Sequence, residues 1–130
     1  MHPKSKLSVL VVDDDDSIRL MVERVLRREH FDVDSARDGS EAIEKLARRD
    51  YGTVLLDLMM PRVDGHGVLQ YLVTESRRSQ PPVIIMTANV QSLDDAHAEL
   101  PVKHVLPKPF DIRQLVSHVR ECCRGIEASA

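Results

Sequence analysis

The sequence lacks long apolar runs, blocks of like charge and well-separated cysteines. No apolar stretch approaches the roughly 20 residues that span a bilayer, and residues 1–6 lack the apolar core of a signal peptide. The two cysteines, Cys122 and Cys123, are adjacent. Neighbouring Cα atoms lie about 3.8 Å apart, which is too close for an ordinary disulfide. We therefore expect reduced thiols and a cytoplasmic protein without membrane contact.

The basic residues are scattered along the chain and the net charge is -3, so no nucleic-acid-binding patch is visible. Internal repeats, low-complexity tracts and long linkers are also missing. A length of 130 residues with 42% hydrophobic and 30% charged content is typical of one compact domain. We expect a single domain over residues 1–130, with a core at residues 6–124 and a tail, or the start of a linker, at 125–130.

Short β-branched runs alternate with amphipathic stretches, a pattern typical of βαβ units in which helices cover both faces of a parallel sheet. The second and fifth of the expected strands have the weakest apolar pattern. The five expected strands are Leu7–Val12, Phe31–Ser35, Thr53–Leu56, Val83–Met86 and Lys103–Leu106. The sequence therefore predicts an α/β fold with a doubly wound, five-stranded parallel sheet. We expect the flavodoxin-like strand order 2-1-3-4-5.

Apolar residues between the strands recur at helical spacing and predict five helices. The first three are marked by Ile18, Val22 and Val25, by Ile43, Leu46 and Ala47, and by Val68, Leu69 and Leu72. The fourth is a short segment from about Gln91 to Glu99 with contacts from Leu93, Ala96 and Leu100, and the last carries Ile112, Leu115, Val116 and Val119. The weakly apolar fourth helix is expected to be the most mobile element.

Carboxylates follow two strands that the expected order makes neighbours. Residues 13–16 are all aspartates after the first strand, and Asp57 ends the third strand. Ligands of open α/β sheets bind beyond the carboxyl ends of the strands, where the strand order reverses. Clustered carboxylates repel each other unless a cation neutralises them, and hard oxygen ligands favour Mg²⁺. An acidic run by itself is more often a solvated loop or a helix cap, and we expect Asp16 to cap the helix beginning near Ser17.

Two further polar residues end the remaining central strands. Thr87 follows an apolar strand, and Lys108 follows the last strand. Alone, such a threonine is usually an ordinary strand residue and such a lysine is usually solvated. Together with the aspartates they predict a site for a phosphoryl group, with charge from a metal ion and Lys108 and orientation from the hydroxyl of Thr87.

The segments Val-Val-Asp-Asp, Leu-Leu-Asp-Leu-Met-Met-Pro, Met-Thr-Ala and Pro-Lys-Pro-Phe occur in the order and spacing of response-regulator receiver domains. The sequence resembles this family over essentially its whole length. The resemblance implies that Asp57 is the phosphoacceptor. It also implies that Asp14 and Asp57 ligate Mg²⁺, for which Mn²⁺ can substitute, that Asp13 contributes through water, and that the backbone carbonyl of Met59 completes the protein ligands.

The same resemblance implies roles for the residues around the phosphoryl group. Thr87 would hydrogen-bond one phosphoryl oxygen, the amide of Ala88 another, and Lys108 would pair with the phosphoryl charge. The bond between Lys108 and Pro109 resembles the family's cis peptide. Thr87 and the residue three before the lysine form the switch, and here that residue is Val105 where the family commonly has Tyr or Phe.

The resemblance implies that the phosphoryl group comes from a sensor histidine kinase or a histidine phosphotransfer protein. The sequence does not identify the downstream target. The signal is expected to pass through the face formed by the fourth helix, fifth strand and fifth helix, in a monomer or a phosphorylation-dependent dimer. Hydrolysis of the phosphorylated form is expected to be slow, because Met59 and Asn89 occupy the positions that flank the attacking water in the family.

Two other protein classes use similar features. A haloacid dehalogenase-type phosphotransferase also phosphorylates an Asp at a strand end, but it needs a second Asp two residues onward, where this chain has Met59. A flavodoxin would need amides and hydroxyls in its first loop, where four aspartates would repel a phosphate. We therefore interpret the chain as a signalling switch rather than an enzyme.

The histidines show no spacing that would place two of them on one helical face as a metal-binding pair. They are expected to lie on the surface. These residues are His2, His30, His66, His97, His104 and His118.

Overall fold

The computed structural model describes residues 7–58, 65–74, 81–88 and 102–129. Within these ranges five parallel strands form one sheet in the order β2-β1-β3-β4-β5, which confirms the predicted fold class. The strands are β1 (Ser8–Val12), β2 (Asp32–Ala36), β3 (Thr53–Asp57), β4 (Val83–Thr87) and β5 (Val102–Pro107). Each predicted strand lies within one or two residues of an observed one.

The position of each strand in the sheet explains how strongly its sequence predicts it. Every residue of β1, β3 and β4 is buried, since helices cover both faces of these central strands. The edge strands β2 and β5 are only partly buried, and each includes at least one exposed residue. Their weaker apolar pattern therefore reflects their location at the two edges.

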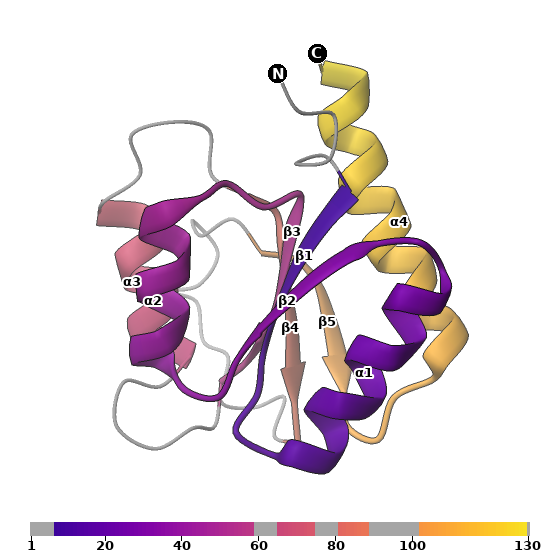
Figure 1. Cartoon of the computed structure of the whole chain (residues 1–130), viewed down its shortest axis with the longest axis horizontal. Coiled ribbons are helices and arrows are strands. Elements are labelled where there is room, and N and C mark those ends of the chain that lie inside the picture. The colour runs from indigo at the N-terminus through magenta and orange to yellow at the C-terminus, as the bar shows by residue number, and fades with distance from the viewer. Residues whose placement is uncertain (1–6, 59–64, 75–80, 89–101, 130) are drawn as a thin grey trace.

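Helices pack on both faces of the sheet, as Figure 1 shows with α1 and α4 on one side and α2 and α3 on the other. They are α1 (Asp16–Arg28), α2 (Gly39–Arg48), α3 (Gly65–Thr74) and α4 (Ile112–Ser129). Two hydrophobic clusters result, one centred on Leu26, Leu55 and Leu115 and the other on Leu56, Leu69 and Ile85. The expected fourth helix, at about residues 91–99, lies outside the described residues, so α4 is the fifth helix of the prediction.

Two local predictions were wrong. The N-cap of α1 is Asp15, whose side chain accepts a hydrogen bond from the amide of Ile18 at 3.1 Å, and Asp16 lies inside the first turn. On α2, Ala42 is buried and Ala47 is exposed, because residues 42, 43 and 46 share one face and 47 turns away from it. The last helix continues through Ser129 and so includes residues 125–129.

The described helices include none that is both long and apolar enough to cross a bilayer. Cys122 and Cys123 are buried on α4 and neither forms a disulfide.

Candidate functional site

Asp13 and Asp57 meet at the carboxyl ends of two neighbouring strands. Val12 of β1 is in register with Leu56 of β3, so the residue that follows each lies at the same edge of the sheet. Both aspartates are buried, with exposed fractions of 0% for Asp13 and 3% for Asp57, whereas Asp14 is exposed. Carboxylate oxygens of these three residues lie within 4.8 Å of one another. The fold therefore gathers the three predicted metal ligands whose positions are described.

Lys108 reaches the same carboxylates from the end of β5. Its Nζ donates a hydrogen bond to Oδ2 of Asp13 at 3.0 Å and lies 3.4 Å from Oδ2 of Asp57. Burial alone would lower the pKa of this ammonium, but the hydrogen bond to Asp13 and the charges of Asp13 and Asp57 outweigh burial and raise the pKa above its usual value. The lysine is therefore fully protonated at neutral pH and neutralises part of the acidic charge.

The end of β4 lies beside this group. Asp57 is in register with Met86, and the next residue, Thr87, is fully buried. The backbone amide of Lys108 donates to the carbonyl of Thr87 at 2.8 Å, and the Lys108-Pro109 bond is cis, as the sequence resemblance implied. Ala88 follows at an exposed position. Thr87 and Lys108 are thus fixed to each other at the edge where the carboxylates converge.

Local hydrogen bonds hold Asp13 in place. Its Oδ1 accepts from the amide of Asp15 at 2.9 Å, and its own amide donates to the carbonyl of Ala36 at 3.2 Å. The guanidinium of Arg19, whose side chain is only 9% exposed, donates to the backbone carbonyl of Asp13 at 3.0 Å and to Oδ1 of Asp16 at 2.6 Å. Sequence reasoning missed Arg19, since an arginine three residues after an aspartate is usually a solvated helix pair.

The donor set fits a hard divalent cation. The cluster brings three carboxyl groups together with one ammonium, that of Lys108, so a divalent cation would balance the excess of acidic groups. Carboxylate oxygens without nitrogen or sulfur ligands are the donors that Mg²⁺ and Mn²⁺ prefer. Asp14 is exposed, which leaves the cluster accessible from solvent. The residues present therefore fit the Mg²⁺ ion that the sequence resemblance implies.

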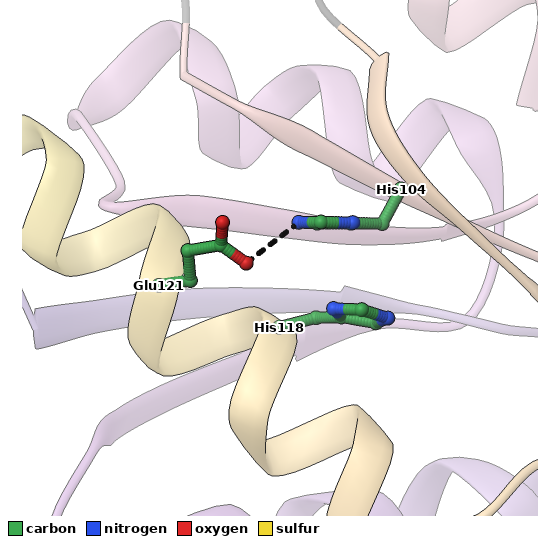
Figure 2. A group of neighbouring side chains, drawn as sticks. All are labelled: His104, His118 and Glu121. Atoms are coloured by element: carbon green, nitrogen blue, oxygen red, sulfur yellow. Dashed lines mark ion pairs between the residues drawn. The ribbon is translucent and has the colours of Figure 1, made fainter.

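Two of the predicted residues have no structural description, because Met59 and Asn89 lie outside the described ranges. Val105, the predicted switch residue, is half-buried and packs against the cluster on the α2 and α3 side of the sheet. The neighbouring His104 points to the opposite side, toward α4 (Figure 2). The roles of all these residues stay predictions.

A second group of side chains was not expected from the sequence. His104 of β5 and His118 of α4 are half-buried and their rings stack, with centroids 3.8 Å apart and planes inclined by 14°. Burial and the nearby His104 lower the pKa of His118, and Glu121 opposes this. The expectation of unrelated surface histidines was therefore wrong for this pair. The pair joins a strand to a helix, so a search for pairs along one helix does not find it.

Comparison with known proteins agrees with this geometry. A family model described as "Response regulator receiver domain" matches residues 9–120. The curated protein "Probable transcriptional regulator ycf27" from Porphyridium aerugineum is 37% identical over 126 residues, covering 96% of this chain and 51% of the relative. The chain thus spans about half the length of the curated relatives that it matches, as it also does for SrrA of Staphylococcus aureus at 49%.

Solved structures resemble the chain over nearly its full length. The CheY-like response regulator receiver domain protein of Methanospirillum hungatei has a TM-score of 0.83 and 27% identity, with 95% of this chain and 98% of that chain covered. The response regulator TrrA of Thermotoga maritima, solved in complex with Mg²⁺ and BeF, has a TM-score of 0.78 and 27% identity, with coverages of 88% and 97%.

Proposed function

The chain belongs to the response-regulator receiver family, the phosphoacceptor modules of two-component signalling, and we propose that its phosphoacceptor is Asp57. The observation that carries this proposal is the position of the Asp57 carboxylate. It is buried at the end of a central strand, within reach of two further carboxylates and 3.4 Å from the ammonium of Lys108. Asp14 is exposed, and the resemblance to receiver domains gives Asp13 the role of holding the metal ion rather than that of accepting the phosphoryl group.

In the proposed reaction a carboxylate oxygen of Asp57 attacks the phosphorus of a phosphohistidine or a small acyl phosphate. A new oxygen–phosphorus bond forms while the bond from phosphorus to the donor nitrogen or oxygen breaks, and the donor leaves with the electron pair. Lys108 is close enough to transfer part of its interaction from the carboxylates to the phosphoryl oxygens. The hydroxyl of Thr87 and the amide of Ala88 would orient two of those oxygens.

Asp13, Asp14 and Asp57 would hold the Mg²⁺ ion, and the backbone carbonyl of Met59 is the further ligand that the family resemblance implies. When bound, this ion supplies positive charge that stabilises the transferring phosphoryl group. The related protein TrrA was solved in complex with Mg²⁺ and BeF, which supports this proposal.

We propose a switch rather than an enzyme with sustained turnover. A phosphatase of the haloacid dehalogenase type needs an acid or base two residues after its nucleophilic aspartate, and Met59 has no titratable group. The proposed donors are a sensor histidine kinase or a histidine phosphotransfer protein. Relatives such as ycf27 are named as transcriptional regulators but are about twice as long as the match, so their output is not assigned to this chain.

The proposal is tested by incubating the protein with acetyl phosphate and recording its intact mass. The wild type should gain the mass of one phosphoryl group with Mg²⁺ and none with EDTA, and Asp57→Asn should gain none, because an amide is not a competent nucleophile. Asp32→Asn is the matched control, since Asp32 is exposed at the opposite end of its strand. Labelling of Asp57→Asn at the wild-type rate would refute the proposal.

A further inference from the structure

Two imidazoles and one carboxylate converge on the face where α4 packs on β5 (Figure 2). His118 and Glu121 are three residues apart on α4, so their side chains project from the same face of the helix. His104 reaches them from β5. Potential ligand atoms of the three residues lie within 4.8 Å of one another. This cluster is formed by residues other than those of the carboxylate site.

We propose that His104, His118 and Glu121 form a binding site for a zinc ion that joins strand β5 to helix α4. Two imidazole nitrogens and one carboxylate oxygen are a ligand set that zinc accepts, with water in the remaining position. Imidazole ligands favour zinc and its neighbours in the transition series over Mg²⁺, so this site and the carboxylate site select different ions.

The distances within the cluster match the size of a zinc site. Tetrahedral zinc with bonds of about 2.0–2.1 Å places its ligand atoms roughly 3.3 Å apart. Nε2 of His104 and Oε1 of Glu121 are 3.1 Å apart, so an ion could replace the proton between them with little movement of either side chain. Glu121 is 68% exposed and His104 is 25% exposed, which gives an ion access from solvent.

One ring has to turn when the ion binds. A metal ion lies in the plane of each imidazole that ligates it, whereas the two rings here are nearly parallel, inclined by 14°. Rotation of His118 about its Cβ–Cγ bond would direct a nitrogen toward the ion, and this torsion has a broad energy minimum in histidine. The lowered pKa of His118 favours the neutral ring that ligates a metal.

Zinc binding is measured by calorimetric titration of the full chain in excess Mg²⁺, which fills the carboxylate site. One equivalent should bind, and His104→Gln or His118→Gln should weaken binding by about tenfold or more, because each removes one of three donors. His30→Asn is the matched control, since His30 is exposed elsewhere on the chain and has a φ of 73°, which Asn tolerates. Equal affinity in the control and the two variants would overturn the proposal.

Two measurements on the wild type remain informative if a variant folds poorly. In a ¹⁵N spectrum of the side chains, zinc should shift ring nitrogens of both His104 and His118, and a spectrum in which neither moves would contradict the site. Cobalt should give the visible absorption of a tetrahedral ion without a thiolate charge-transfer band. Such a band would mean that Cys122 or Cys123 binds the metal instead, and the assignment would then be wrong.

Discussion

The Nζ atom of Lys108 donates a hydrogen bond to Oδ2 of Asp13 at 3.0 Å, across 95 residues of sequence. The two residues follow β5 and β1, which are separated in the sheet by β3 and β4. The side chain of Lys108 therefore reaches across the carboxyl ends of the central strands, and its Nζ also lies 3.4 Å from Oδ2 of Asp57 at the end of β3. The ion pairs of Lys108 with Asp13 and Asp57 therefore offset the repulsion between the buried carboxylates and contribute to the stability of the fold.

Replacing Lys108 should lower the free energy of unfolding. Lys108→Met leaves two buried aspartates without their ammonium, and removing one partner of a fully buried pair costs about 3–5 kcal/mol. We expect a smaller loss of about 2 kcal/mol in metal-free buffer, because the lysine is 15% exposed and Asp14 opens the site to solvent. Urea unfolding measures this loss of stability, and Lys103→Met, at an exposed position of β5, is the control. A loss no larger than that of the control would contradict this role of the ion pairs.

Mg²⁺ should stabilise the protein through the carboxylates. A ligand that binds only the folded state at 100 times its dissociation constant adds about 2.7 kcal/mol to the free energy of unfolding. Asp14→Asn should bind Mg²⁺ more weakly and therefore show a smaller rise in Tm, because the cluster loses an anionic ligand. Asp14 is exposed, so the variant should fold normally. An unchanged Mg²⁺ affinity by titration would place the ion elsewhere.

The hydrogen bonds to Asp34 predict how stability depends on pH. Lys45 and Tyr51 donate to the two carboxylate oxygens of Asp34 at 2.9 and 2.7 Å. Burial alone would raise the pKa of this carboxyl, but these contacts outweigh it and the pKa is lowered from 3.8. A group whose folded pKa is depressed contributes stability above its unfolded pKa, and loses it as the pH falls through the folded value.

Tyr51→Phe tests this pH dependence, because it removes one donor and keeps the buried ring. We expect a loss of about 1 kcal/mol at neutral pH, since Asp34 is partly exposed and its interactions are screened. As the pH falls below 3.8, the difference from the wild type should shrink, because Asp34 becomes protonated at its lowered pKa. Thermal unfolding at a series of pH values measures it, and a difference that stays constant down to pH 2 would exclude this role.

The carboxylate site was largely predictable from the sequence, whereas the contacts around it were not. Parallel strands place their carboxyl ends at one edge, so aspartates after the first and third strands had to meet there. The four consecutive aspartates are chemically alike, so the sequence does not distinguish which of them caps the helix. The prediction named Asp16, and the cap is Asp15. The contact of Arg19 with the Asp13 carbonyl depends on how α1 rotates over the sheet, which apolar spacing defines only as a face.

The pairing of His104 with His118 shows the same limit. Helical spacing predicts which side of α4 meets the sheet, because Leu115 and Val119 are buried there. It does not predict which residue of β5 lies opposite His118, since this depends on the offset between helix and strand. A register shift between β4 and β5 at Val83 and Ile84 adds to that offset. Such a contact becomes visible only when the three-dimensional packing is known.

The switch is expected to work without an aromatic side chain. Val105 has one stiff side-chain torsion and packs against the hydrophobic cluster on the α2 and α3 side of the sheet. A rotation of this side chain would therefore change the exposed surface very little. Amide shifts with and without beryllofluoride and Mg²⁺ should change mainly between Thr87 and Leu100. Val105→Tyr should alter the affinity for a partner more than the phosphorylation rate. Shifts confined to Asp14, Asp57 and their immediate neighbours would argue against a conformational signal.

The identity of the phosphorylated residue is the central claim and can be measured directly. Borohydride reduces an aspartyl phosphate to homoserine, and peptide mass spectrometry then locates the altered residue. After treatment with acetyl phosphate and Mg²⁺, we expect homoserine at position 57 and unmodified aspartate at 13 and 14, because Asp57 is the proposed nucleophile, buried at the end of β3 with its Oδ2 3.4 Å from the ammonium of Lys108. Homoserine at position 13 or 14 with Asp57 unmodified would contradict the account.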